Sequence, residues 1–500
     1  MKKMTKNLFV FVLTVLLLTV TTVGVFSVYA DEEETSPFTY EITDGTVTIT
    51  GCDAAISGVL EIPESIEDAP VTAIGKKAFY GCKKLTTVTI PASVTAIGGV
   101  AFGDCTSLTA IRVDKNNTAY CDENGILFNK DMTRLECFPS RHSTGTYVIP
   151  ASVTTIGSRS FFGCVLSAVT IPDTVTTIET SAFHFSPGLK EVVIPDSITS
   201  IEYGVFSSCI GLEKVTIPSS VTSIGKYAFS GCAALEEVVI PDKVTFIGDS
   251  AFSGCSSLKK INIPVGVTAI GDRVFYMCKS LPQIELPDTV TSIGDRAFFF
   301  CDALKTVHMG KNVITIGNET FSGCYELDDI ALSDTLASIG DQAFHYCQSL
   351  ATLEIPQGVT TIGYGAFAEC SALTKLTIPE NVNVVENSTF RDCAELVEVS
   401  LPKKATTVES DAFFGCQALV QVNYGGSVND QNKMDVSDGN SKLTGAKWIY
   451  AVEEEPVKVV VPEEEEINLP PWLVVIIYIV VILLAIGFLI LLFRQKPSEY

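Results

Sequence analysis

The sequence predicts a solenoid of stacked repeats that is exported and tethered to a membrane. Three observations lead to this prediction. A unit of 23 residues recurs through most of the 500-residue chain. An apolar segment near the N-terminus has the pattern of an export signal, and a second one near the C-terminus is long enough to span a bilayer.

The first 30 residues have the pattern of a secretory signal peptide. Three lysines precede an apolar stretch at residues 8–20, and Ala30 ends a stretch suited to cleavage by signal peptidase. The alternative is an uncleaved N-terminal anchor, for which the apolar stretch is short. We therefore expect residues 1–30 to be a signal peptide, removed after Ala30.

The repeat can be written A-F-x-x-C-x-x-L-x-x-V-x-I-P-x-x-V-T-x-I-G-x-x. Eleven of the thirteen intervals between its Phe residues are 23 residues, one is 22, and one is 59, which we interpret as 23 plus an insertion of 36. A fixed period of about 20 to 29 residues is typical of leucine-rich repeats, whose neighbouring units share one continuous core. We expect repeats over residues 76–424, with the insertion at about 114–148. The recurring Phe residues are Phe79, Phe102, Phe161, Phe183, Phe206, Phe229, Phe252, Phe275, Phe298, Phe321, Phe344, Phe367, Phe390 and Phe413.

The C-terminal segments predict a stalk and a membrane anchor. Residues 451–471 mix Glu, Val and Pro, which is typical of an extended, solvated spacer. Residues 473–493 carry no charge and would span about 30 Å as a helix. Trp472 lies at one edge, and two cations follow within residues 494–500, so the positive-inside rule places this short tail in the cytoplasm.

The chain also resembles the BspA-like leucine-rich-repeat proteins outside the regular repeats. Residues 31–75, with Val47-Thr48-Ile49, look like the N-terminal capping unit of that family. The insertion, with Gly125-Ile126-Leu127-Phe128, looks like its long hairpin-bearing unit, and residues 425–450 resemble its C-terminal closing unit. The resemblance implies a protein of the bacterial surface, and an adhesin for host matrix or plasma proteins or for other microbes.

Thirteen of the sixteen cysteines occupy one position of the repeat. Stacked equivalents would lie about 5 Å apart, but their parallel Cβ vectors oppose a disulfide. We therefore expect buried free thiols in this column, and the one Ser at the same position, Ser186, indicates that a small residue is enough there. Cys121 and Cys137, in the insertion, are a separate pair for which a bridge stays open. The column consists of Cys82, Cys105, Cys164, Cys209, Cys232, Cys255, Cys278, Cys301, Cys324, Cys347, Cys370, Cys393 and Cys416.

Charge and motifs exclude several classes of function. The formal net charge is −24 and no stretch is rich in Lys or Arg, which argues against nucleic-acid binding. The four His fit no metalloprotease pattern, and no nucleophile-elbow, Walker or dinucleotide fingerprint occurs. We therefore expect no catalysis, no cofactor and no structural metal.

Binding would be encoded at the outward positions of the predicted strands, which we expect on the concave side. The second residues of successive strands include Glu191, Lys214, Glu237 and Lys260, whose alternating sign indicates a cross-strand charge ladder. The later strands have fewer partners of opposite charge. The candidate ligand-binding residues there are Glu285, His308, Asp329 and Glu354.

These observations predict a cell-surface binding protein, an adhesin that engages proteins or cell-surface polymers outside the cell and is held in the membrane by its own helix. The alternative is a structural or envelope-spacing surface protein without a specific partner. A receptor is disfavoured by the seven-residue tail. A metal at Glu285 and His308 would have too few ligands to be predicted.

Overall fold

The computed structural model describes residues 36–142, 145–451 and 469–494, which form two separate units. The first is the repeat solenoid, which ends at Ala451, and the second holds the C-terminal helix. The predicted signal peptide, most of the predicted stalk and all but the first residue of the predicted tail lie outside the described residues.

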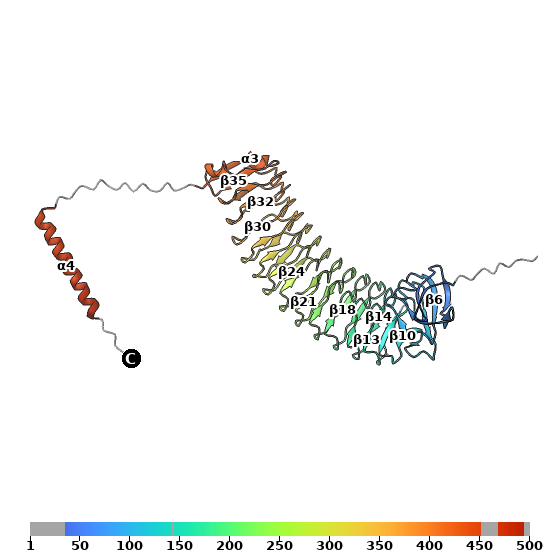
Figure 1. Ribbon diagram of the computed structural model, residues 1–500. Coiled ribbons are helices and arrows are strands. Elements are labelled where there is room, and N and C mark those ends of the chain that lie inside the picture. The colour runs from blue at the N-terminus through green and yellow to red at the C-terminus, as the bar shows by residue number, and fades with distance from the viewer. Residues whose placement is uncertain (1–35, 143–144, 452–468, 495–500) are drawn as a thin grey trace, which may run out of the picture. The chain divides into compact units, whose positions relative to one another are not determined.

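Most repeats contribute two short strands, so two columns of parallel strands run along the solenoid (Figure 1). The first column contains the V-x-I strands. They are β3 (Ser57–Glu61), β6 (Lys84–Ile90), β8 (Ala110–Val113), β12 (Thr146–Val148), β14 (Ala168–Thr170), β16 (Glu191–Val193), β18 (Lys214–Thr216), β20 (Glu237–Val238), β22 (Lys260–Ile261), β24 (Gln283–Glu285), β26 (Thr306–His308), β28 (Asp329–Ile330), β31 (Lys375–Thr377), β33 (Glu398–Leu401), β35 (Gln421–Tyr424) and β37 (Lys447–Tyr450).

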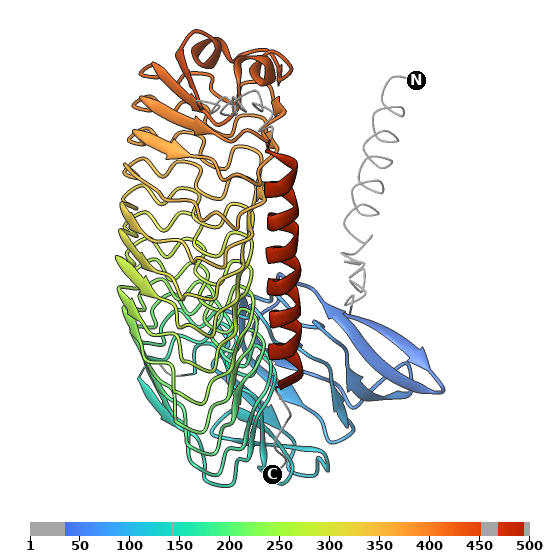
Figure 2. The same ribbon diagram turned by 90° about the vertical axis from the view of Figure 1, so that its left-hand side faces the viewer.

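The second column contains the T-x-I strands, most of which are two residues long, and Figure 2 shows how successive repeats stack along the solenoid. They are β2 (Thr46–Cys52), β5 (Ala69–Ile74), β7 (Ala96–Ile97), β11 (Arg134–Cys137), β13 (Thr155–Ile156), β15 (Thr177–Ile178), β17 (Ser200–Ile201), β19 (Ser223–Ile224), β21 (Phe246–Ile247), β23 (Ala269–Ile270), β25 (Ser292–Ile293), β27 (Thr315–Ile316), β29 (Ser338–Ile339), β30 (Thr361–Ile362), β32 (Val384–Val385), β34 (Thr407–Val408) and β36 (Asp435–Val436).

Equivalent residues pair across neighbouring repeats, as Val192 with Val215 and Ile224 with Ile247. This register keeps the inward side chains of all repeats on the core side of the sheet, because a shift of one residue would point the inward side chains of a strand to the solvent. The return arc between the columns is made of turns. Residues two before and two after the repeat Phe have positive φ, as Arg296 (56°) and Phe300 (50°) do around Phe298. Many repeats place Gly at the second of these positions, such as Gly254 with φ 72°.

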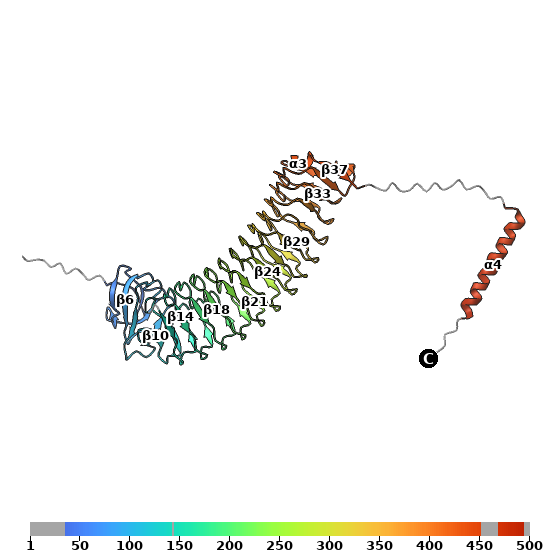
Figure 3. The ribbon, with the colours of Figure 1, turned by 180° about the vertical axis from the view of Figure 1, so that it is seen from behind.

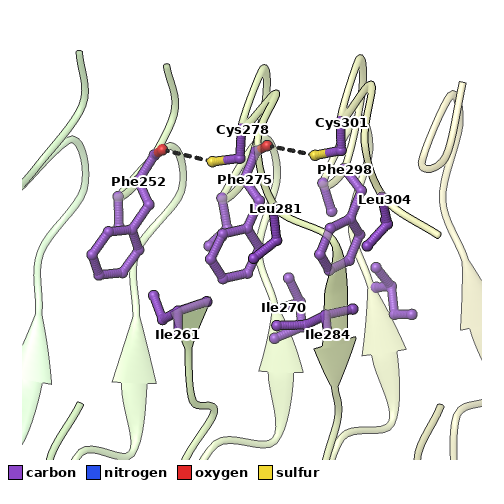
Figure 4. Close-up of a cluster of buried hydrophobic side chains, with 14 of the residues drawn as sticks. Phe252, Ile261, Ile270, Phe275, Cys278, Leu281, Ile284, Phe298, Cys301 and Leu304 are labelled. Carbon is purple, nitrogen blue, oxygen red and sulfur yellow. Dashed lines mark hydrogen bonds between the residues drawn. The ribbon is translucent and has the colours of Figure 1, made fainter. Parts of the chain in front are cut away.

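The repeat Phe side chains form a stacked column through the core (Figure 4). Ring centroids of neighbouring repeats lie between 4.6 and 6.0 Å apart. Phe298, for example, has no exposed surface and stacks on Phe275 and Phe321. A single repeat could not enclose such a ring, so each unit depends on its neighbours for burial.

The insertion is shorter than the sequence suggested. Phe138 belongs to the column, because its ring lies 5.1 Å from that of Phe161 and its amide donates to the Ser160 carbonyl at 2.7 Å. The 59-residue interval is therefore a 36-residue repeat followed by a regular one of 23 residues, and the expectation of a 36-residue insertion is wrong. The extra residues form the antiparallel hairpin of β9 (Tyr120–Glu123) and β10 (Ile126–Asn129).

Strand β10 separates two hydrophobic cores. Leu127 packs in the core of the N-terminal repeats, whereas Ile126 and Phe128 pack in the core of all the later repeats. The hairpin also decides whether Cys121 and Cys137 can form a disulfide. They lie on β9 and β11, the two strands on either side of β10, which places them about 10 Å apart, too far for a disulfide.

Both ends of the solenoid close with irregular units (Figure 3). At the N-terminal end β1 (Phe38–Thr43) pairs antiparallel with β2, and β4 (Ser65–Ile66) pairs antiparallel with β5. At the C-terminal end two short helices, α2 (Val428–Gln431) and α3 (Ser441–Thr444), stand beside β36 and β37. The buried Asn440 donates to the Glu409 carbonyl at 2.8 Å and accepts from the Phe413 amide at 3.0 Å, which connects this unit to the last column Phe.

Helix α4 (Pro471–Arg494) forms the second unit and includes the predicted membrane span. It is the one helix among the described residues that is long and apolar enough to cross a bilayer. Its described side chains up to Ile490 are almost all exposed, as an anchor in lipid requires.

Candidate binding surface

The outward rows of the first strand column form the exposed face on which we expected binding. Inward residues such as Ile284 and Val307 are buried, and the residues on either side of them point away from the core. The four candidate residues Glu285, His308, Asp329 and Glu354 are all exposed. Glu285 lies directly beside His308 in the strand register.

Asp329 and Glu354 lie further along the same face. Asp329 is the register partner of Thr306, and so lies diagonally next to His308. Glu354 belongs to the following repeat, which forms only an isolated bridge between Thr352 and Lys375 in this column. The structure therefore places three of the four residues on adjacent strands and the fourth at a break in the sheet.

The charge ladder predicted for the earlier strands is present. Lys214 lies 2.9 Å from Glu191, and Lys260 lies 2.7 Å from Glu237. These pairs are well exposed, so each contributes a few tenths of a kcal/mol at most. A similar pair joins Lys375 to Glu398, at 2.6 Å, beyond the break.

Among the described residues, the charged candidate residues between the pair Lys260–Glu237 and the pair Lys375–Glu398 have no partner of opposite charge. Within the part of the chain that the structure describes, the side chains of the four candidate residues make no hydrogen bond or ion pair. The nearby cations Lys305 and Lys311 are paired with Asp328 and Asp288. This part of the face is therefore an acidic strip.

A hollow of about 940 Å³ opens at the break in the sheet. Its floor is apolar and its rim is polar. Of the four candidate residues only Glu354 lines it, next to Asp334, Thr352 and Lys375 on the rim. The floor consists of Ile330, Leu332, Leu353, Ile355 and Leu376.

The residues of the hollow were missed in the sequence, although a signal for them exists. Most strands of the first column end in Ile-Pro or Leu-Pro, but two successive repeats have Met309-Gly310 and Leu332-Ser333 instead. Leu332 is only partly buried, unlike the equivalent Leu286, which is 4 % exposed. The irregular repeats therefore mark where apolar side chains become accessible.

The residues of this surface are suited to binding rather than to catalysis. Glu285 and His308 alone would be two ligands, and no group of three or more His, Cys, Asp or Glu among the described residues could hold a metal ion. The elongated stack of short parallel strands and tight return arcs defines a leucine-rich-repeat solenoid, a class that generally binds other molecules and is generally not enzymatic.

Comparison with known proteins identifies the family. The model of the BspA type leucine rich repeat region matches in six copies, over residues 60–130, 131–259, 199–328 and 314–434. The chain belongs to this family, as its sequence predicted. A comparison with curated proteins gave no match.

One solved structure agrees on the fold, and two others are similar over most of the chain at lower TM-scores. A leucine-rich repeat protein from Bacteroides ovatus is 25 % identical, with a TM-score of 0.57 and coverage of 83 % of this chain and 98 % of that one. A leucine rich cell surface protein from Faecalibacterium prausnitzii is 27 % identical, with a TM-score of 0.44 and coverage of 80 % and 96 %. The pneumococcal vaccine antigen PcpA is 18 % identical, with a TM-score of 0.43 and coverage of 83 % and 97 %.

Proposed function

We propose that this chain is a single-pass adhesin of the bacterial surface, which binds proteins or cell-surface polymers outside the cell. Family membership supports the general role, and the apolar α4 supports the anchor. The predicted signal peptide at residues 1–30 and the cations Arg494, at the end of α4, and Lys496, just beyond it, favour an orientation in which the repeats lie outside the cell.

The observation that carries the proposed site is the coincidence of the acidic strip with the hollow. Three of the four uncompensated side chains lie on β24, β26 and β28, and the hollow begins at β28. A specific protein contact needs about 800 Å² on each partner, and several adjacent strands with their loops can supply that area. An apolar floor inside a charged rim also matches the arrangement of interface hot spots.

The chemistry of the surface indicates what a partner must offer. An apolar side chain would enter the hollow, and cationic groups would face Glu285, Asp329 and Glu354. Attraction between exposed charges acts mainly on the association rate and is screened by salt. We therefore expect attachment to weaken as the ionic strength rises.

The test compares two fourfold variants displayed on cells. In the first, Glu285, His308, Asp329 and Glu354 are replaced by Gln, Gln, Asn and Gln. The matched control replaces the paired residues Glu191, Lys214, Glu237 and Lys260 by Gln, on the same face of earlier strands. Attachment is measured on surfaces coated with matrix proteins, plasma proteins or other bacterial cells, with display level and thermal unfolding measured in parallel.

We expect the first variant to attach at least tenfold more weakly than the wild type, and the control to attach normally. Normal attachment of the first variant would exclude the strip, and the 36-residue repeat with the β9–β10 hairpin would become the next candidate. If the wild-type chain shows no saturable attachment to any of these surfaces, the spacer alternative replaces the adhesin.

A further inference from the structure

Cys82 differs from every other cysteine of the repeat column. In the twelve later repeats that carry a column cysteine, its thiol donates to the carbonyl of a column Phe 26 residues earlier, as Cys301 does to Phe275 at 3.1 Å. Ser186 makes the equivalent bond to Phe161 at 2.6 Å. Cys82 belongs to the first repeat, so no earlier column Phe exists to accept its thiol.

The thiol of Cys82 instead faces the N-terminal cap. Its sulfur lies 3.9 Å from the carbonyl oxygen of Asp53, the residue that follows Cys52, and Cys52 packs against the same hydrophobic core that contains Cys82. Cys52 is the last residue of β2 and the one cysteine of the cap. Both side chains therefore lie at the junction of the cap and the first repeat.

Local contacts hold this junction in place. The amide of Asp53 donates to the Pro37 carbonyl at 2.8 Å, and the Ile56 amide donates to the Asp53 carbonyl at 3.1 Å, so the turn after β2 is fixed. Phe38, the register partner of Cys52, packs edge-on against Phe79 with centroids 6.3 Å apart.

The geometry that prevents disulfides within the column does not apply to this pair. Column cysteines are equivalent residues of stacked repeats, so their Cβ vectors are parallel. Cys52 lies on β2, three residues after Ile49, whereas Cys82 lies eight residues after Ile74, the register partner of Ile49, so the two cysteines are not equivalent residues and their Cβ vectors need not be parallel. Cys121 and Cys137, the remaining cysteines outside the column, are separated by β10.

We propose that Cys52 and Cys82 form a disulfide in the exported protein, which fastens the cap to the first repeat. The oxidant is the disulfide of an extracytoplasmic thiol oxidoreductase or of a small oxidised thiol. The Cys52 thiolate attacks one sulfur of that disulfide and releases the other as a thiolate, and the Cys82 thiolate then displaces the remaining oxidant sulfur from Cys52. The pair loses two protons and two electrons, and the oxidant becomes two thiols.

The order of these steps follows from exposure. Cys52 is partly exposed, whereas Cys82 has no exposed surface, so the oxidant meets Cys52 first. Burial raises the pKa of Cys52 to about 12 and raises the pKa of Cys82 as well. Since the thiolate is the reactive form, the folded pair reacts slowly at neutral pH.

The disulfide would act where a solenoid is weakest. A terminal unit packs on one neighbour only, so it opens more readily than a central repeat. The link from Cys52 to Cys82 closes a loop that contains β3, β4 and β5. Closing this loop restricts the unfolded cap and thereby stabilises the folded one.

The test uses the full chain, purified in detergent and refolded with or without oxidised glutathione. Free thiols are blocked in denaturant with iodoacetamide, and protease fragments are analysed by mass spectrometry. We expect a fragment that joins Cys52 to Cys82 and blocking of fourteen of the sixteen cysteines. Hydrogen exchange of residues 38–74 should be at least tenfold slower in the oxidised chain than in the reduced chain.

Two variants serve as matched controls, since both replace a partly exposed cysteine. In Cys52→Ser, iodoacetamide should react completely with Cys82, and hydrogen exchange of the cap should no longer differ between oxidised and reduced chains. Cys121→Ser should keep both the cross-link and this difference in exchange. Complete blocking of all sixteen cysteines in an oxidised, folded wild-type chain would overturn the proposal. A cross-link between any other two cysteines in place of this one would overturn it equally.

Discussion

Replacing Phe298 by Ala should destabilise the solenoid at its centre. Phe298 has no exposed surface, and its ring stacks 5.3 Å from that of Phe275 and 5.4 Å from that of Phe321. The substitution removes a buried ring and both stacking contacts while leaving the backbone carbonyl that accepts the Cys324 thiol at 3.2 Å. The change is therefore confined to the core.

The magnitude follows from the cavity. Removing the ring leaves a space of about 100 Å³, which at about 24 cal/mol per Å³ costs about 2.4 kcal/mol in addition to about 2 kcal/mol for the lost apolar transfer. Neighbouring rings are held by strand pairing in the same register, so the cavity cannot collapse easily. We expect a loss of about 3 to 5 kcal/mol in local stability.

Hydrogen exchange is the suitable assay, because long repeat arrays need not unfold in one step. Amides of the repeats around Phe275, Phe298 and Phe321 should exchange faster, and those near both ends of the solenoid should change little. Phe299→Ala is the control, since its ring is only partly buried and stacks on Tyr276 at the surface. A loss below about 1 kcal/mol for Phe298→Ala, or equal losses for both variants, would refute the argument.

Three further outcomes are expected. Thiol titration of the chain refolded without oxidant should find nearly all sixteen cysteines reactive in denaturant, and the twelve column thiols beyond Cys82 unreactive in the folded state. Gly310→Ala should lower the unfolding temperature by several degrees, because a Cβ there would lie 2.3 Å from the Pro287 carbonyl oxygen, whereas Gly99→Ala, which meets nothing, should not. Arg134 hydrogen-bonds to Glu179 and lowers the pKa of that carboxyl. The pair therefore stabilises the fold at pH values above the pKa of Glu179 in the unfolded state, and this stabilisation is lost as the pH falls. Lowering the pH from about 5 to about 3 should reduce the free energy of unfolding, measured with urea, more in the wild type than in Glu179→Gln, by a few tenths of a kcal/mol.

Most of the fold could be predicted from the sequence, because the residues that recur in each repeat determine its strands and its core. The inward Leu, Val, Ile and Phe positions recur at fixed spacing, and nearly all of them are buried, with Leu332 beside the hollow among the exceptions. The failure at Phe138 has a local cause. Three residues after Phe138 stands Arg141, whereas a Cys stands there after every other column Phe residue except Phe183, which is followed by Ser186. A pattern that includes this Cys therefore missed a regular interval of 23 residues.

The candidate surface was predictable only in part. Charge pairing could be anticipated, because neighbouring strands align equivalent residues, as Glu191 with Lys214. The hollow could not be predicted, because it lies where the strands of the first column fail to pair around Thr352. The sequence of that repeat itself follows the regular pattern. Its neighbours, with Met309-Gly310 and Leu332-Ser333, carry the deviation. The junction of Cys52 and Cys82 also escaped notice, because Cys52 lies outside the period.

Two kinds of irregularity fall in the same stretch of the solenoid, and this bears on function. A repeat protein gains stability from regular strand pairing and from compensated charges, and the earlier strands have both. Between β24 and β31, within the described part of the chain, the carboxylates of Glu285, Asp329 and Glu354 lack partners and the sheet of the first column is broken. Neither feature stabilises the isolated chain, because the first leaves like charges near one another and the second exposes apolar side chains. Both would be compensated by a partner that brings cations and an apolar group to this face, which is why this stretch, rather than the regular ladder before it, is the place to look for binding.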